Sequence, residues 1–178
     1  MVQQATSSEP LLIRVKEQLA VRGEPPWGET ILDDGRNELG LICDKPGDSN
    51  DAHIHLDYDE WWVVFQGEII WEIGDYPPVH AKEGDIVVCP AGKRHHIKTV
   101  GSEPSLRLAV SKYGSNHDIR GERSSELEPL PEQELPPNLL VTRRDEMLAH
   151  FGEPRWGHDI VENQVNRAML ISHAPGMS

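Results

Sequence analysis

The sequence predicts an all-β fold, either a sandwich or a barrel. Between residues 37 and 113, seven segments of four to eight residues are rich in β-branched or aromatic side chains. Turn-forming sequences such as KPGDSN, GDYPP and PAGK separate them, and no helical pattern lies between them. The 14 prolines and 15 glycines of the chain favour many short connections over long helices.

The strands are expected where the β-branched and aromatic residues cluster. In chain order they are Asn37–Cys43, Ala52–Leu56, Glu60–Gln66, Glu68–Ile73, Ile86–Cys89, His95–Val100 and Leu106–Tyr113. Seven strands at this spacing, without helices between them, are typical of a sandwich or barrel.

An N-terminal arm precedes these strands. Leu12, Val15 and Leu19 recur at helical spacing, which predicts a short helix over residues 11–22. Residues 23–36 contain several prolines and glycines, so we expect a turn-rich connection there.

The C-terminal part begins with a change of composition. Residues 119–140 are acidic, rich in proline and without an apolar period, which predicts a linker over the surface. A second short helix is expected at Thr142–Phe151, with Thr142 as its N-cap and Gly152 ending it. The expected parts are an arm (1–36), a barrel (37–118), the linker (119–140) and a C-terminal arm (141–178).

The C-terminal arm repeats the N-terminal one. Residues 14–49 align with residues 143–178 at a constant offset of 129, with 16 identities in 36 positions and no gap. The chain therefore resembles one complete unit followed by the opening of a second. The arm is either the remnant of a two-domain ancestor, an element of a homodimer interface, or a cover for an open sheet edge.

Charge and composition restrict the partners and the location. The 30 acidic residues exceed the 17 lysines and arginines, which argues against nucleic acid and anionic membranes as partners. The chain has no apolar run of membrane-spanning length, and its first ten residues do not resemble a secretory signal. The two cysteines form no disulfide framework, so we expect a cytoplasmic protein. The expected partner is a small-molecule substrate.

The residues that carry chemistry lie between positions 47 and 95. His53 and His55 are two apart, which on a strand places both imidazoles on one face. Glu60 opens the next expected strand, and His95 lies on a later one. Imidazoles and a carboxylate converging from neighbouring strands suit a divalent transition metal rather than calcium or magnesium. The alternative for an isolated His-x-His is a packing or surface role.

These residues resemble two motifs of the cupin superfamily. The first is Gly, five residues, His-x-His, three or four residues, Glu, six residues, Gly. The chain supplies Gly47, His53, His55, Glu60 and Gly67 at that spacing. The second is Gly, five residues, Pro-x-Gly, two residues, His, three residues, Asn. The chain supplies Gly84, Pro90, Gly92 and His95, with Thr99 in place of the Asn.

The resemblance covers about residues 37–113 and implies a cupin-type jelly-roll β-barrel, with short flanking helices in the two arms. It implies one metal ion inside the barrel, held by His53, His55, Glu60 and His95. Four protein ligands leave two positions on an octahedral ion, which suits a chelating substrate, or one substrate atom and dioxygen. Fe²⁺ is favoured, with Mn²⁺, Ni²⁺ or Zn²⁺ as alternatives. His96 should face outward.

The resemblance does not fix the reaction. The leading hypothesis is a metal-dependent dioxygenase on a small anionic or aromatic oxygenated substrate. Glu60 would complete the metal sphere and accept a proton when displaced. The alternatives are a redox-neutral isomerase or lyase that uses the metal as Lewis acid, and a non-catalytic small-molecule-binding cupin. Locally the chain resembles acireductone dioxygenase in its two metal motifs, but here Trp61 and Trp62 follow the Glu. It also resembles 3-hydroxyanthranilate dioxygenase in its Glu-Trp run, although that family uses fewer ligands.

The substrate pocket is expected beside the metal ligands. Its apolar wall would be formed by Trp62, Val64 and Trp71 (or Ile69 in place of Trp71), which lie on the expected strands Glu60–Gln66 and Glu68–Ile73. Arg107, if it points inward, would bind a carboxylate, and its alternative is a solvent-exposed surface position.

Overall fold

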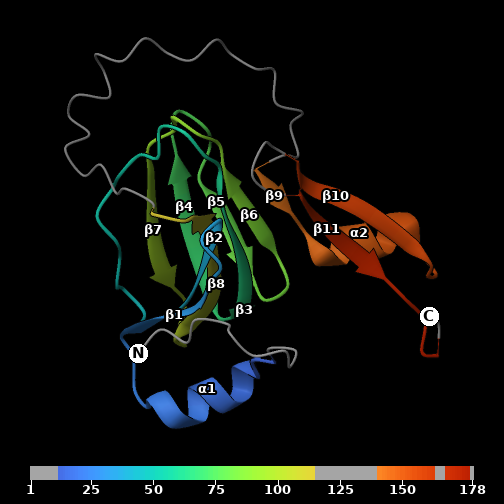
Figure 1. Ribbon diagram of the computed structural model, residues 1–178, viewed down its shortest axis with the longest axis horizontal. Helices are drawn as coiled ribbons and strands as arrows, with labels where there is room; N and C mark the ends of the chain where they lie inside the picture. Colours follow the sequence, from blue (N-terminus) through green and yellow to red (C-terminus); the bar gives the residue numbers. More distant parts are fainter. Residues whose placement is uncertain (1–11, 115–139, 163–166, 177–178) are drawn as a thin grey trace.

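The fold is a two-sheet β-barrel of the jelly-roll type, as the sequence predicts. The structure is a computed structural model, and it describes residues 12–114, 140–162 and 167–176. Within these residues no helix is both long and apolar enough to cross a membrane. Figure 1 shows the two sheets side by side, with α1 below them and the C-terminal elements to one side.

The larger sheet contains six strands in the order β1-β2-β8-β3-β6-β9. Its members are β1 (Trp27–Asp33), β2 (Asn37–Asp44), β8 (Ser105–Lys112), β3 (Glu60–Gln66), β6 (Ile86–Cys89) and β9 (Val141–Thr142). The smaller sheet has the order β5-β4-β7, formed by β5 (Val79–Lys82), β4 (Glu68–Ile73) and β7 (His95–Val100). All paired strands are antiparallel.

The core lies between the two sheets, and strands such as β3, β4, β5 and β7 bury alternate residues towards it. On β3, the buried positions are Glu60, Trp62 and Val64, while the residues between them are only half-buried. The apolar core is formed by Trp62, Val64, Ile69, Trp71, Ile73, Val79, Ala81, Val87, Cys89, Ile97 and Ala109. The same alternation that buries these apolar side chains points Glu60 into the barrel.

The turn between β3 and β4 depends on Gly67. Its φ of 75° is unfavourable for residues with a side chain, and an added Cβ would lie 2.7 Å from the carbonyl oxygen of Pro104. This tight turn joins the two sheets directly after the strand that carries Glu60.

The predicted strand bounds are confirmed for four segments: Glu60–Gln66, Glu68–Ile73, Ile86–Cys89 and His95–Val100. The prediction for Ala52–Leu56 is wrong as a regular strand, because this segment makes an isolated bridge at His53. The turn-rich connection expected over residues 23–36 contains β1, and β5 was not predicted. Pairing with β2 and β4 stabilises these two strands more than their local composition does.

The two flanking helices are shorter than expected. α1 spans Val15–Arg22 and α2 spans Arg144–Phe151. Thr142 is not the N-cap of α2; it lies in β9, and Arg143 occupies the cap position without a side-chain hydrogen bond. Of the predicted linker, residues 119–139 lie outside the described residues.

The two arms have the same local structure. In the N-terminal arm, β1 and β2 pair with Trp27 opposite Cys43, and a bulge falls between Thr30 and Leu32. In the C-terminal arm, β10 (Trp156–Glu162) and β11 (Arg167–Ser172) pair with Trp156 opposite Ser172. The bulge there falls between Asp159 and Val161, which is the same register at the offset of 129.

The C-terminal arm packs on the outer face of its own barrel. Ile160 and Val161 are buried against Ile86 and Val88, with Trp61, Val63, Ala168 and Leu170 packed around them. The β9 strand pairs with the edge strand β6. The predicted homodimer stays a prediction.

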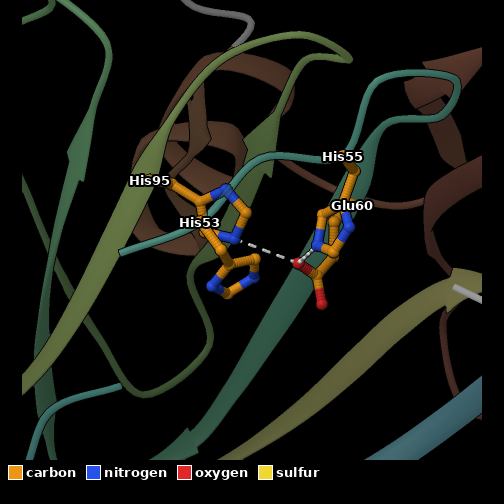
Figure 2. A group of neighbouring side chains, drawn as sticks. All are labelled: His53, His55, Glu60 and His95. Atoms are coloured by element: carbon orange, nitrogen blue, oxygen red, sulfur yellow. Dashed lines mark hydrogen bonds and ion pairs between the residues drawn. The ribbon is translucent and has the colours of Figure 1, made fainter. Parts of the chain in front are cut away.

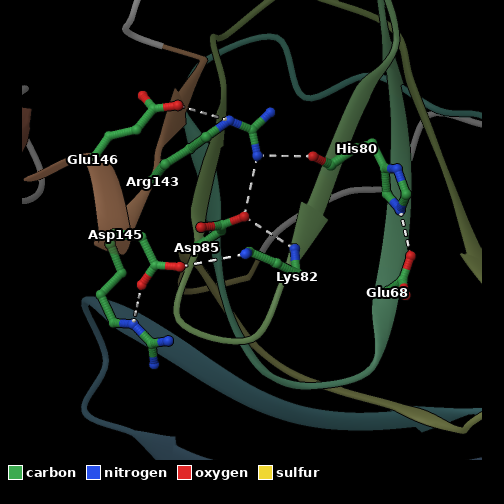
Figure 3. Close-up of polar contacts among 8 residues, drawn as sticks. Glu68, His80, Lys82, Asp85, Arg143, Asp145 and Glu146 are labelled. Atoms are coloured by element: carbon green, nitrogen blue, oxygen red, sulfur yellow. Dashed lines mark hydrogen bonds and ion pairs between the residues drawn. The ribbon is translucent and has the colours of Figure 1, made fainter.

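Polar contacts at the base of α2 anchor this arm, as Figure 3 shows. Arg143 donates to the backbone carbonyl of His80 over 2.9 Å and to the carboxylate of Asp85 over 3.2 Å. Asp85 is buried, and it also accepts a hydrogen bond from the backbone N–H of Lys82 at 3.0 Å. The guanidinium therefore compensates a buried carboxylate at the joint between the arm and the barrel.

Candidate metal centre

The four residues expected to bind a metal lie together inside the barrel. His53 and His55 come from the segment between β2 and β3, Glu60 opens β3 and His95 opens β7. All four are buried, with exposed fractions between 1% and 7%. One donor atom from each lies within 4.8 Å of the others. Figure 2 shows the side chains facing one another.

Backbone pairing brings His53 to His95. The two residues form an isolated antiparallel bridge, and their ring centroids are 4.2 Å apart. The ring of His55 lies 4.8 Å from that of His53 and 5.3 Å from that of His95. The segment from 51 to 59 therefore need not be a regular strand to deliver two imidazoles to one point.

Glu60 lies at the centre of this group. Its Oε2 atom is 2.9 Å from Nε2 of His55 and 3.2 Å from Nε2 of His95 (Figure 2). Burial raises the pKa of the Glu60 carboxyl, but hydrogen bonds from His55 and His95 outweigh burial and lower this pKa to about 2. Glu60 is thus a buried carboxylate whose negative charge requires a positive partner.

The outward nitrogen of each imidazole is engaged by the protein. Nδ1 of His53 lies 2.7 Å from the carbonyl oxygen of Asp51. Nδ1 of His55 lies 2.6 Å from the hydroxyl of Tyr58, and Nδ1 of His95 lies 3.3 Å from the thiol sulfur of Cys89.

These contacts fix the orientation of the rings. A carbonyl oxygen can only accept, so Nδ1 of His53 carries a proton and Nε2 keeps its lone pair. At His55 and His95, the tautomer that leaves Nε2 available to a metal has Nδ1 donating to the Tyr58 hydroxyl and to the Cys89 sulfur. Three imidazole nitrogens and one carboxylate form a donor set that fits a divalent transition metal.

Sequence reasoning missed these three supporting residues. Tyr58 and Asp51 flank the His-x-His motif, and Cys89 ends β6. Burial raises the pKa of the Cys89 thiol, and the negative charge of Glu60 raises it further, so it stays neutral. A polar residue three positions after a ligating His was the available signal for Tyr58.

A cavity of about 350 Å³ opens beside the metal ligands. It is lined by Ile42, Asn50, Asp51, His53, Glu60, Trp62, Ile97 and Arg107. Of the predicted substrate-binding residues, Trp62 and Arg107 lie on this wall. Val64 and Trp71 are fully buried in the apolar core and are not among the residues that line this cavity, so their contact with a substrate stays a prediction.

Two further side chains are placed by strand alternation. Arg107 is 4% exposed and its Nη1 donates to the carboxylate of Asp44 over 2.6 Å, so the surface alternative is wrong. His96, next to the inward His95, lies on the outer side, where its Nδ1 is 3.1 Å from Glu72. This matches the expectation that the two neighbours face opposite sides.

Comparisons with known proteins agree with the fold. The family described as "Cupin domain" matches residues 40–111, a range that contains all four clustered residues. No curated protein matches the sequence.

Solved structures share the barrel at low sequence identity. A protein from Bacillus halodurans superposes with a TM-score of 0.52 at 13% identity, covering 60% of this chain and 83% of that one. An uncharacterized conserved protein with a double-stranded beta-helix domain from Klebsiella pneumoniae gives 0.51 at 24% identity, with 60% and 92% covered. A protein from Thermus thermophilus gives 0.51 at 21% identity, with 57% and 95% covered.

Proposed function

Because this chain belongs to the cupin superfamily through residues 40–111, we propose that it is a metal-dependent enzyme. The proposed activity is that of a dioxygenase on a small anionic or aromatic oxygenated substrate. The proposed metal site is formed by His53, His55, Glu60 and His95, with Fe²⁺ as the favoured ion.

One observation carries the proposal: all three imidazoles have contacts at Nδ1, Nε2 of His55 and of His95 both lie beside one Glu60 oxygen, and a donor atom of His53 lies within 4.8 Å of theirs. A group of buried histidines that served packing alone would not need this common orientation. When bound, a transition metal supplies Lewis acidity and, as iron, reactivity towards dioxygen.

The protein part of the site forms a small cavity. Ile42, Trp62 and Ile97 give part of its wall an apolar character. A volume of about 350 Å³ lies at the small end of the range for ligand sites, so we propose a substrate of few atoms.

Glu60 is proposed to hold and release a proton at its carboxylate. While His55 and His95 lie beside Oε2, the low pKa keeps the group ionised. Loss of those contacts leaves burial as the dominant influence, which raises the pKa and makes Glu60 a better base. Displacement from the imidazoles would therefore turn a charge-balancing group into a proton acceptor.

Oxygen uptake tests the proposal. Protein loaded with Fe²⁺ is mixed with a panel of catechols and enediols, and oxygen consumption is followed with product analysis. We expect substrate-dependent uptake that the His53→Ala variant lacks. Turnover under nitrogen with Mn²⁺ would instead indicate a redox-neutral isomerase or lyase. Full metal occupancy without turnover would indicate a non-catalytic binding protein.

A further inference from the structure

Arg107 is a buried cation on the cavity wall with an incomplete set of partners. It lies in the middle of the larger sheet, where β8 pairs it with Ile42 on one side and Val64 on the other. Its Nη1 donates to Asp44, but Nε is buried and has no hydrogen-bond partner among the described residues. Buried N–H groups of charged side chains rarely stay without an acceptor, so this edge of the guanidinium is available for a ligand.

The charges around the cavity favour an anion at this position. The divalent metal of the proposed function would outweigh the charge of Glu60, and Asp44 occupies only one edge of Arg107. Asp51 also lines the cavity, but it is solvent-exposed, so its charge is screened. The planar guanidinium edge matches the two oxygens of a carboxylate better than it matches any neutral group.

The position of Arg107 separates this anion site from the metal ligands. Val64 pairs with Arg107 and lies four residues beyond Glu60 on β3, so the backbones are about 13 Å apart along the strand. Both side chains reach into the same cavity, and the apolar Trp62 lies between them on β3. A substrate that meets both the metal ligands and Arg107 along this wall would therefore carry one polar group at each end.

Resting on the proposed function, we infer that Arg107 binds a carboxylate at the far end of the substrate. The substrate class is then a small carboxylic acid whose metal-binding oxygens lie at the opposite end of a short carbon skeleton. Ile42, Trp62 and Ile97 contact that skeleton. Arg107 selects the substrate by its distal carboxylate, while the four clustered residues bind the reacting end through the metal.

A matched pair of probes tests this inference by binding alone. 2-Oxoglutarate and 2-oxohexanoate share the 2-oxo acid end, but only the first has a distal carboxylate. Titration calorimetry on Mn²⁺-loaded protein under nitrogen should give about ten- to hundredfold tighter binding of 2-oxoglutarate. Equal affinities, or no binding of either acid at millimolar concentration, would overturn the inference.

Variants assign the difference to Arg107. In Arg107→Met, 2-oxoglutarate should bind no better than 2-oxohexanoate, while Arg94→Met, which alters an exposed arginine, should keep the wild-type preference. A preference for 2-oxoglutarate that survives in a folded Arg107→Met protein overturns the inference. If that variant does not fold, the titration of wild-type protein with the two acids decides the question. Metal content measured before titration separates the two proposals. Protein without bound Mn²⁺ contradicts the proposed metal site, whereas loaded protein with equal affinities contradicts only the role of Arg107.

Discussion

His53 and His95 pair through their backbones as one rung of an antiparallel sheet. The N–H of each donates to the carbonyl oxygen of the other, over 3.1 Å and 2.9 Å. The two residues are 42 positions apart in the sequence, and this rung sets their ring centroids 4.2 Å apart. The distance between these two imidazoles is thus fixed by main-chain hydrogen bonds rather than by flexible side chains.

Metal binding should depend on which of two adjacent histidines is removed. His95→Ala removes a buried imidazole from the cluster, and we expect the bound metal to fall well below one ion per chain. His96→Ala removes the neighbouring ring, which contacts Glu72 on the outer side, and should retain the metal. Elemental analysis of both purified proteins checks this. Equal metal loss in the two variants would contradict the assigned site.

Tyr58 should raise the metal affinity of the site without being a metal ligand itself. Its hydroxyl lies 2.6 Å from Nδ1 of His55, so Tyr58→Phe removes the group that orients this ring. We expect metal affinity to fall about ten- to hundredfold, measured by competition with a chelator. Tyr113→Phe, at an exposed position, is the control and should bind metal like the wild type. Unchanged affinity in Tyr58→Phe would show that the hydroxyl does not position His55.

The C-terminal arm should contribute to the stability of the barrel. Ile160 is buried against Ile86 and Val88, so Ile160→Ala should lower the free energy of unfolding by about 2–4 kcal/mol. Ile171 lies on the same hairpin but is 55% exposed, so Ile171→Ala should change it by at most about 0.5 kcal/mol. Urea unfolding curves measure both values. Similar small effects would mean that the hairpin does not pack as described.

Asp34 should make stability depend on pH under acidic conditions. Its carboxylate accepts hydrogen bonds from the backbone N–H groups of Asn37 and Arg36 and from the Arg36 side chain, in that order of influence, which lowers the pKa to about 2. The native pKa is below the unfolded value, so the stabilisation is complete above about pH 4 and is lost towards pH 2. The stability difference between wild type and Asp34→Asn should therefore shrink over this range. Parallel pH profiles for the two proteins would refute it.

The local sequence was sufficient to predict the direction of a side chain where strand alternation and motif spacing agree. Glu60 and His95 each open a strand with alternating burial, so their inward direction followed from period two. The ligand set could be proposed because its spacing matches a family motif.

Tertiary contacts decided the features that sequence reasoning missed. Trp27–Asp33 lies among prolines and glycines, and it is a strand because it pairs with β2. The inward direction of Arg107 depends on the register of β8 between β2 and β3, which no single strand encodes. The contacts of Tyr58 and Cys89 to Nδ1 atoms depend on the folded positions of both partners.

Anomalous X-ray diffraction from crystals of the Fe²⁺- or Mn²⁺-loaded protein tests the metal site most directly. We predict one strong peak per chain inside the barrel, bonded to Nε2 of His53, His55 and His95 and to the carboxylate of Glu60. A peak elsewhere, or a barrel without any peak when the protein contains stoichiometric metal, would contradict the proposed centre.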